Sequence, residues 1–184
     1  MIVQDKRGFF VIWGYDMYQI GEKVVYGIHG VCLVTDQEER RIDKKYVTYL
    51  VLEPVGQEGA KYYVPTHNAA AMAKLRGMLS AEELEALIRS AAIKGEAWIR
   101  DENQRKQIYR ELISSGDREK LIGMVASLYR HREQQSTAGK KIHMCDENFL
   151  RDAEKLLVGE ISVVMGLEQD QAKQYLRNKL KEDA

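Results

Sequence analysis

The chain has 184 residues, which is enough for one medium domain or two small ones, and its 45% hydrophobic content supports a folded core. Basic and acidic residues number 28 each, so the chain lacks the large positive charge by which histone-like proteins hold DNA phosphates. No apolar run reaches the roughly 20 residues of a membrane span, and the N-terminus has no signal-peptide pattern. We therefore expect a cytoplasmic protein without a membrane partner.

The residues that usually carry catalysis or bind metals are sparse. Cys32 and Cys145 lie far apart in the sequence, so they cannot form a CxxC-type metal site, and nothing indicates a disulfide framework. The four histidines show no i,i+4 pairing, and the GxSxG, Walker A, HExxH and GxGxxG motifs are missing from the sequence. We expect no enzymatic activity, no metal, no cofactor and no small-molecule substrate.

The first half of the chain has the pattern of short strands. Residues 18–34 predict two strands joined by a glycine-containing turn at residues 27–30, because valine, isoleucine and tyrosine suit a half-buried pleated surface. Residues 46–65 predict two more strands around a second glycine-containing turn, and residues 74–76 a last short strand. Close turns without an intervening helix indicate a small antiparallel β-barrel.

Residues 1–16 fit this pattern poorly. Their apolar and aromatic run from Gly8 to Trp13 precedes a second methionine, Met17. We interpret residues 1–16 as an amino-terminal extension and expect Met17 to be the natural start. The alternative is an extra edge strand that pairs with the barrel.

The second half of the chain is predicted to be wholly helical. Ser80 and Glu83 form a capping-box pattern that opens the first helix, and Gly95 is expected to end this segment. Several helices with short loops indicate a compact bundle. The further helices are expected over residues 101–114, 117–134, 146–164 and 168–181, the first three capped by the aspartate with which each begins.

Five short segments in a fixed order carry a family resemblance: IGEKVVYGIHGV, YLVLEP, YYVP, WIR and SGDREKL. With them, the chain from about residue 17 to about residue 159 resembles the CarD/CdnL family of bacterial transcription regulators. The resemblance implies an α+β fold. Residues 17–77 would form a small Tudor-like antiparallel β-barrel that binds the RNA polymerase β subunit, and residues 78–184 an all-α helical bundle that contacts promoter DNA.

The resemblance also points to residues for polymerase binding. The charged segment at residues 36–45 is, by composition alone, typical of a solvated hairpin. In relatives a basic residue at a matching point contacts polymerase, which implies this role for Arg40 and its neighbour Arg41. Arginine suits it because its planar fork pairs with carboxylates in bidentate fashion. A second family contact, often basic, falls on Tyr63, which can supply contact area but no charge.

The candidates for DNA contact are Trp98, Arg100, Arg105 and Lys106. An indole can wedge into a partly opened base step while nearby cations hold phosphates, and the resemblance implies this role near the upstream edge of the promoter bubble. On the residues alone, Trp98 could equally pack inside the bundle. A weak DNA contact would suffice if polymerase already held the protein close to the promoter.

Three functions follow from these observations. The leading one is a regulator that binds the polymerase β subunit and stabilises the promoter open complex through its helical domain. The second is a protein–protein adaptor without DNA contact. The third is a small RNA-binding protein, against which the scarcity of aromatic and basic clusters on the predicted strands counts.

Overall fold

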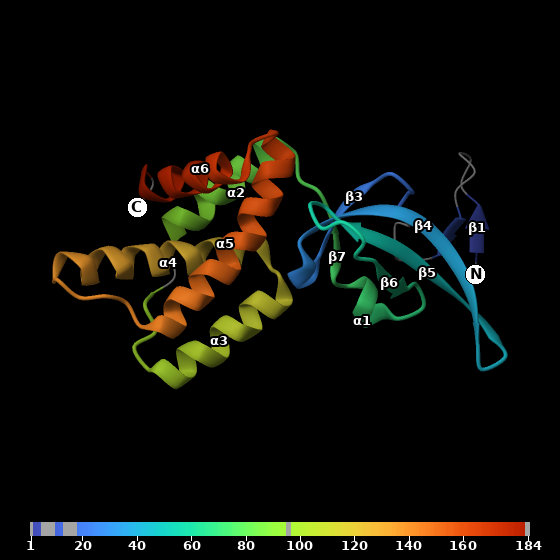
Figure 1. Cartoon of the computed structure of the whole chain (residues 1–184), viewed down its shortest axis with the longest axis horizontal. Coiled ribbons are helices and arrows are strands. Elements are labelled where there is room, and N and C mark those ends of the chain that lie inside the picture. The colour runs from blue at the N-terminus through green and yellow to red at the C-terminus, as the bar shows by residue number, and fades with distance from the viewer. Residues whose placement is uncertain (1, 5–9, 13–17, 95–96, 183–184) are drawn as a thin grey trace. The chain divides into compact units, whose positions relative to one another are not determined.

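The computed structural model describes residues 2–4, 10–12, 18–94 and 97–182 (Figure 1). A five-stranded antiparallel sheet is followed by several helices, which confirms the predicted α+β class. The chain divides into two compact units, Met1–Val24 with Cys32–Ala73 and Val25–Val31 with Lys74–Ala184. The domain borders expected at residues 16/17 and 77/78 remain predictions. None of the helices in the described ranges is long and apolar enough to cross a membrane.

The sheet has the strand order β6-β5-β4-β3-β7. It is not closed in the way the predicted barrel would be, because β6 and β7 remain as its two edges. These edge strands have only four and three residues, too few for an extended ladder between them. The strands are β3 (Lys23–Tyr26), β4 (Val31–Ile42), β5 (Lys45–Pro54), β6 (Tyr62–Pro65) and β7 (Leu75–Gly77).

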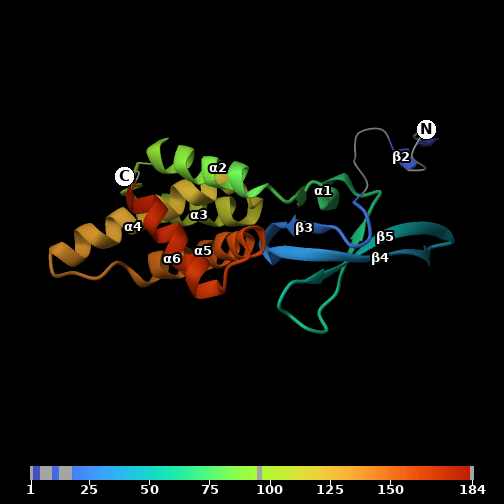
Figure 2. The same ribbon diagram turned by 90° about the horizontal axis from the view of Figure 1, so that it is seen from above.

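The longest ribbon of the sheet is the antiparallel pair β4–β5, whose register runs from Cys32 opposite Pro54 to Ile42 opposite Lys45. Asp43 and Lys44 connect the two strands, both with positive φ, as a two-residue hairpin loop requires. Side chains 39–46 are all exposed, so the outer half of the ribbon has no core beneath it. Both views show this paired ribbon along its whole length (Figures 1 and 2). We call residues 36–45 the arm.

Two short strands lie in the amino-terminal segment, β1 (Ile2–Gln4) and β2 (Phe10–Ile12). They pair with each other in an antiparallel sheet of their own, and the five-stranded sheet does not include them. The alternative of an extra edge strand on the five-stranded sheet is therefore not found among the described residues. Trp13 and Met17, on which the interpretation of this segment rested, lie outside those residues.

The helix ends confirm most of the predicted caps. Ser80 and Glu83 exchange hydrogen bonds of 3.1 and 2.8 Å, and the carboxylates of Asp101 and Asp117 accept from the backbone three residues on. Gly95 lies outside the described residues. The short α1 was not predicted. The helices are α1 (Ala69–Met72), α2 (Ala81–Lys94), α3 (Glu102–Ser115), α4 (Arg118–Thr137), α5 (Met144–Met165) and α6 (Gln169–Glu182).

One predicted cap is wrong. Asp146 does not cap α5, because this helix begins two residues earlier and its N-cap position is occupied by His143. Asp146 instead lies in the first turn, where its side chain is 1% exposed and binds Arg105 of α3. This buried carboxylate fixes the position of the Arg105 guanidinium.

Helix α4 forms the centre of the helical unit. Its residues from Leu121 to Tyr129 are all buried, which an amphipathic surface helix would not show. It packs against α2, α3 and α5, while α6 packs on α2 and α5. Helix α6 contributes Ala172, Leu176 and Leu180, spaced four residues apart so that they share one face.

Candidate functional site

The sheet brings two of the predicted polymerase-binding residues together. The guanidinium carbon of Arg40 on β4 lies 3.9 Å from the ring centroid of Tyr63 on β6 and 5.8 Å from that of Tyr49 on β5. Side chains two residues apart share a face of a strand, so Glu38 lies beside Arg40. It accepts hydrogen bonds of 3.0 and 2.8 Å from the Arg40 Nε and Nη2 atoms. We call Glu38, Arg40, Tyr49 and Tyr63 the Arg40 face.

The third predicted residue, Arg41, is exposed but belongs to the opposite side of the ribbon, because neighbouring side chains alternate. Its strand partner is Tyr46, which is 69% exposed; Ile42 follows Arg41 in the chain, lies on the Arg40 side of the ribbon and is 45% exposed. Neither Tyr46 nor Ile42 was predicted to have a functional role. Their position at the end of the charged segment 36–45 was the signal that could have found them, since large apolar side chains are uncommon in solvated hairpins.

In the helical unit, Trp98 lies between α2 and α3 and is half-buried against the core. Its indole stacks on the His131 ring of α4, with ring centroids 3.6 Å apart and an interplanar angle of 12°. The Arg105 guanidinium carbon lies 4.5 Å from the indole centroid. Trp98 is thus neither sealed in the core nor free. Its plane is fixed by two neighbours while part of it remains accessible.

Arg105 uses its charge inside the protein. It is 5% exposed, and its Nε and Nη2 atoms donate to the Asp146 carboxylate at 2.8 and 3.0 Å. Its Nη1 atom donates to the carbonyl oxygen of Ile99 at 2.8 Å, which ties down the segment that carries Trp98. The bond to Asp146 raises the pKa of Arg105. Every guanidinium nitrogen of Arg105 donates a hydrogen bond within the protein, so Arg105 holds the segment of Trp98 in place, while its expected contact with DNA stays a prediction.

The remaining two predicted cations differ in availability. Lys106 forms an i,i+4 ion pair of 2.5 Å with Glu102, which also raises the pKa of the lysine. Arg100 is exposed. Of the four residues expected to contact DNA, the structure therefore leaves Trp98 and Arg100 accessible and neutralises the charge of Lys106 locally.

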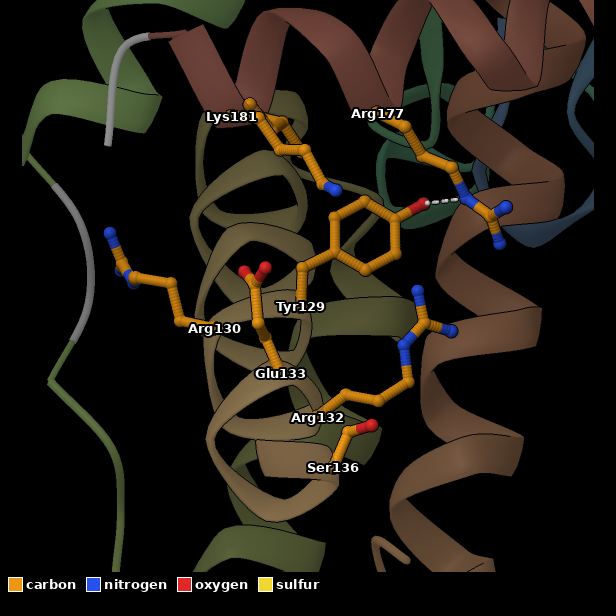
Figure 3. A pocket seen from close by; sticks show the side chains of 8 residues that line it. Tyr129, Arg130, Arg132, Glu133, Ser136, Arg177 and Lys181 are labelled. Carbon is orange, nitrogen blue, oxygen red and sulfur yellow. Dashed lines mark hydrogen bonds between the residues drawn. The ribbon is translucent and has the colours of Figure 1, made fainter. Parts of the chain in front are cut away.

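A richer group of cations lies between α4 and α6, where a cavity of about 520 Å³ opens to solvent. In Figure 3 the side chains of Arg132, Arg177 and Lys181 point toward the Tyr129 ring, whereas Arg130 points away. The Arg132 guanidinium carbon lies 4.9 Å from the Tyr129 ring centroid. We call this the α4–α6 cavity; its lining consists of Tyr129, Arg130, Arg132, Glu133, Ser136, Arg177, Leu180 and Lys181.

The α4–α6 cavity has four cations and one carboxylate in its lining. A second carboxylate, that of Glu154, does not line the cavity but accepts a hydrogen bond from the Tyr129 hydroxyl. Burial opposes ionisation of Glu154, but this bond and Lys173 at 2.9 Å lower the pKa of the carboxyl overall. The sequence signal for these cations was the run Tyr-Arg-His-Arg at residues 129–132. In this run two arginines flank His131, the residue on which Trp98 stacks.

Three side chains of the types that can ligate a metal also meet in the helical unit. Glu102, His143 and Cys145 each place one ligand atom within 4.8 Å of the others. No metal site was expected from the sequence, because the two cysteines lie far apart and the histidines show no helical spacing. The structure instead combines one cysteine and one histidine with a carboxylate that precedes them by about 40 residues.

Comparison with protein families identifies the class to which the chain belongs. The matching families are those of transcription regulators that interact with RNA polymerase. The family model of the CarD-like/TRCF RID domain matches residues 18–76, and that of the CarD C-terminal domain matches residues 86–177, half of the chain. The chain belongs to the CarD/CdnL family.

Proposed function

We propose that this protein binds the RNA polymerase β subunit through the Arg40 face and that its helical unit then acts on promoter DNA at the upstream edge of the bubble, stabilising the open complex. The observation that carries the proposal is the contact between Arg40 and Tyr63. Two residues that the family resemblance selects separately meet on one exposed surface, 3.9 Å apart.

The chemistry of the Arg40 face supports a protein partner. Arginine and tyrosine are enriched among residues that dominate binding energy at interfaces. The Arg40 side chain is 44% exposed yet already oriented by Glu38 and Tyr63, so less conformational freedom is lost when a partner carboxylate binds. Tyr63 belongs to β6, an edge strand of the sheet, where an extended segment of the partner can add by strand pairing.

Binding to fragments of the polymerase β subunit tests this half of the proposal. Arg40→Glu reverses the charge of the Arg40 face and should weaken binding by more than about tenfold. Arg89→Glu is the matched control, because Arg89 is also exposed and also paired with a carboxylate, but lies on α2. Binding by Arg40→Glu equal to that of the wild type would contradict the proposal.

The helical unit offers an accessible indole and cations for the DNA half of the proposal. Trp98 supplies a ring of fixed plane that can reach a distorted base step. Arg100 and the cations of the α4–α6 cavity, rather than Arg105 and Lys106, can contact phosphates. The chain as a whole is neutral, so its affinity for free DNA should be low and the contact should depend on polymerase.

Protection of promoter DNA within the polymerase complex separates this function from the adaptor alternative. Trp98→Ala should lose protection at the upstream edge of the bubble while retaining polymerase binding. Equal protection by wild type and Trp98→Ala would favour an adaptor whose helical unit contacts protein only.

A further inference from the structure

A second, chemically distinct group of side chains lies where α3 and α5 begin. Glu102 is the first residue of α3, His143 directly precedes α5, and Cys145 is the second residue of α5. One carboxylate oxygen, one imidazole nitrogen and one sulfur atom lie within 4.8 Å of one another. Glu102 and His143 are exposed and Cys145 is half-buried, so an ion can reach all three from solution.

We propose that Glu102, His143 and Cys145 form a binding site for a thiophilic divalent cation of the zinc type. Thiolate, imidazole and carboxylate are the three ligand types that bind Zn²⁺ in proteins, and harder ions such as Mg²⁺ and Ca²⁺ take oxygen ligands instead. The inference concerns neither polymerase nor DNA, so it stands independently of the proposed function.

The geometry needs only small adjustments to accept the ion. With bonds of about 2.0–2.3 Å, ligand atoms around a tetrahedral zinc ion lie roughly 3.3–3.8 Å apart. The three side chains therefore have to close by about an ångström, which rotation of Glu102 and of His143 at the surface allows. The three ligands leave one position to a water molecule, so we expect an exchangeable site rather than a closed structural one.

Lys106 competes with the ion for Glu102. Its ammonium lies 2.5 Å from a Glu102 carboxylate oxygen and forms an ion pair with the carboxylate that the metal would bind. Lys106 is only half-buried, so its ammonium can move into solvent when the ion binds. The Cys145 thiol transfers its proton to solvent as the metal–sulfur bond forms, and the Glu102 and His143 ligands bind as carboxylate and neutral imidazole.

Coordination is favoured over thiol redox chemistry at this position. Burial, with a further contribution from Asp146, raises the pKa of the Cys145 thiol, so without a metal it is not a ready nucleophile. The other cysteine, Cys32, is fully buried on β4. Coordination to a metal ion would deprotonate the Cys145 thiol at neutral pH.

The position of the site connects it to Trp98. Cys145 precedes Asp146, which holds Arg105, and the guanidinium of Arg105 lies over the indole of Trp98. An ion bound by Glu102 and Cys145 would link the start of α3 to the start of α5, the same two helix ends that the Arg105–Asp146 ion pair joins. We therefore expect occupancy of the metal site to alter the environment of Trp98.

Cobalt absorption spectroscopy on the metal-free full-length chain tests the proposal. Co²⁺ should bind with one-to-one stoichiometry and give a sulfur-to-cobalt charge-transfer band with visible bands typical of tetrahedral cobalt, and Zn²⁺ should displace it. Cys145→Ser should abolish the charge-transfer band, and His143→Gln should weaken binding by more than about tenfold. Lys106→Gln should strengthen binding, which a merely adventitious thiol site would not show.

Cys32→Ser is the matched control, since it removes the other thiol and should leave the band unchanged. A band that is absent in the wild type, that persists in Cys145→Ser or that is lost in Cys32→Ser would overturn the assignment. Folding is monitored by circular dichroism, and if Cys145→Ser does not fold, His143→Gln decides. Protection of the Cys145 thiol from a thiol reagent by Zn²⁺ gives a second readout in the wild-type chain, and absence of protection would also overturn the proposal.

Discussion

The buried ion pair between Arg105 and Asp146 offers the sharpest test of how the helical unit is held together. Their side chains are only 6% and 1% exposed, and two nitrogen–oxygen distances of 2.8 and 3.0 Å join them. Asp146→Ala leaves the Arg105 guanidinium buried without its counter-charge. Removing one member of such a pair costs about 3–5 kcal/mol.

The exposed ion pair of Lys94 and Glu119 provides the scale for comparison. Its nitrogen–oxygen distance is 2.7 Å, as short as that of the buried pair, but its side chains are 69% and 48% exposed. Glu119→Ala should therefore cost only about 0–1 kcal/mol. The contrast between these two variants tests mainly the effect of burial, because the shortest nitrogen–oxygen distances of the two pairs are nearly equal.

Urea unfolding followed by the helical circular dichroism signal measures both variants. With a urea dependence of about 2 kcal/mol per molar, Asp146→Ala should lower the midpoint by about 1.5–2.5 M and Glu119→Ala by less than about 0.5 M. Arg105→Met combined with Asp146→Leu should recover most of the lost stability, since apolar residues can replace a buried pair. Equal midpoints for Asp146→Ala and Glu119→Ala would show that burial does not set the cost of breaking an ion pair here.

Two further predictions concern pH and a helix cap. Burial lowers the pKa of His131 below its usual 6.5; Asp146 opposes this shift in part and Arg105 adds to it. The stability contributed by the neutral stacked ring is therefore complete above pH 6.5 and is lost as the pH falls through the lowered pKa. In a Trp13→Phe background the fluorescence of Trp98 should report this transition, and a signal still pH-dependent after His131→Gln would contradict the assignment. Ser80→Ala should cost about 1 kcal/mol in the same urea assay, because it removes half of the capping box; no change would show that the cap does not matter.

The sequence predicted best what is decided locally. The strands on either side of residues 27–30 and the caps at Ser80, Asp101 and Asp117 follow from neighbouring residues, because turns and caps depend on backbone geometry within three or four positions. Helix α1 was missed because its four residues are too few to show a period.

Partners distant in sequence could not be predicted in the same way. Helical periodicity indicated a buried face for the helix after Asp101, but it does not say which residue lies opposite, and Asp146 is 41 positions from Arg105. An aspartate just before an apolar helical run is usually a cap, so the local rule favoured the wrong role. The stack of Trp98 on His131 was hidden for the same reason.

We propose that the sheet unit binds polymerase and thereby lets the helical unit act on the promoter. Promoter opening by polymerase, followed with a fluorescent base placed at the upstream edge of the bubble, tests it most directly. We expect wild-type protein to prolong the open state, Trp98→Ala to bind polymerase without this effect, and Arg40→Glu to lose both binding and effect. An Arg40→Glu protein that still prolongs the open state as the wild type does would rule out action through the Arg40 face.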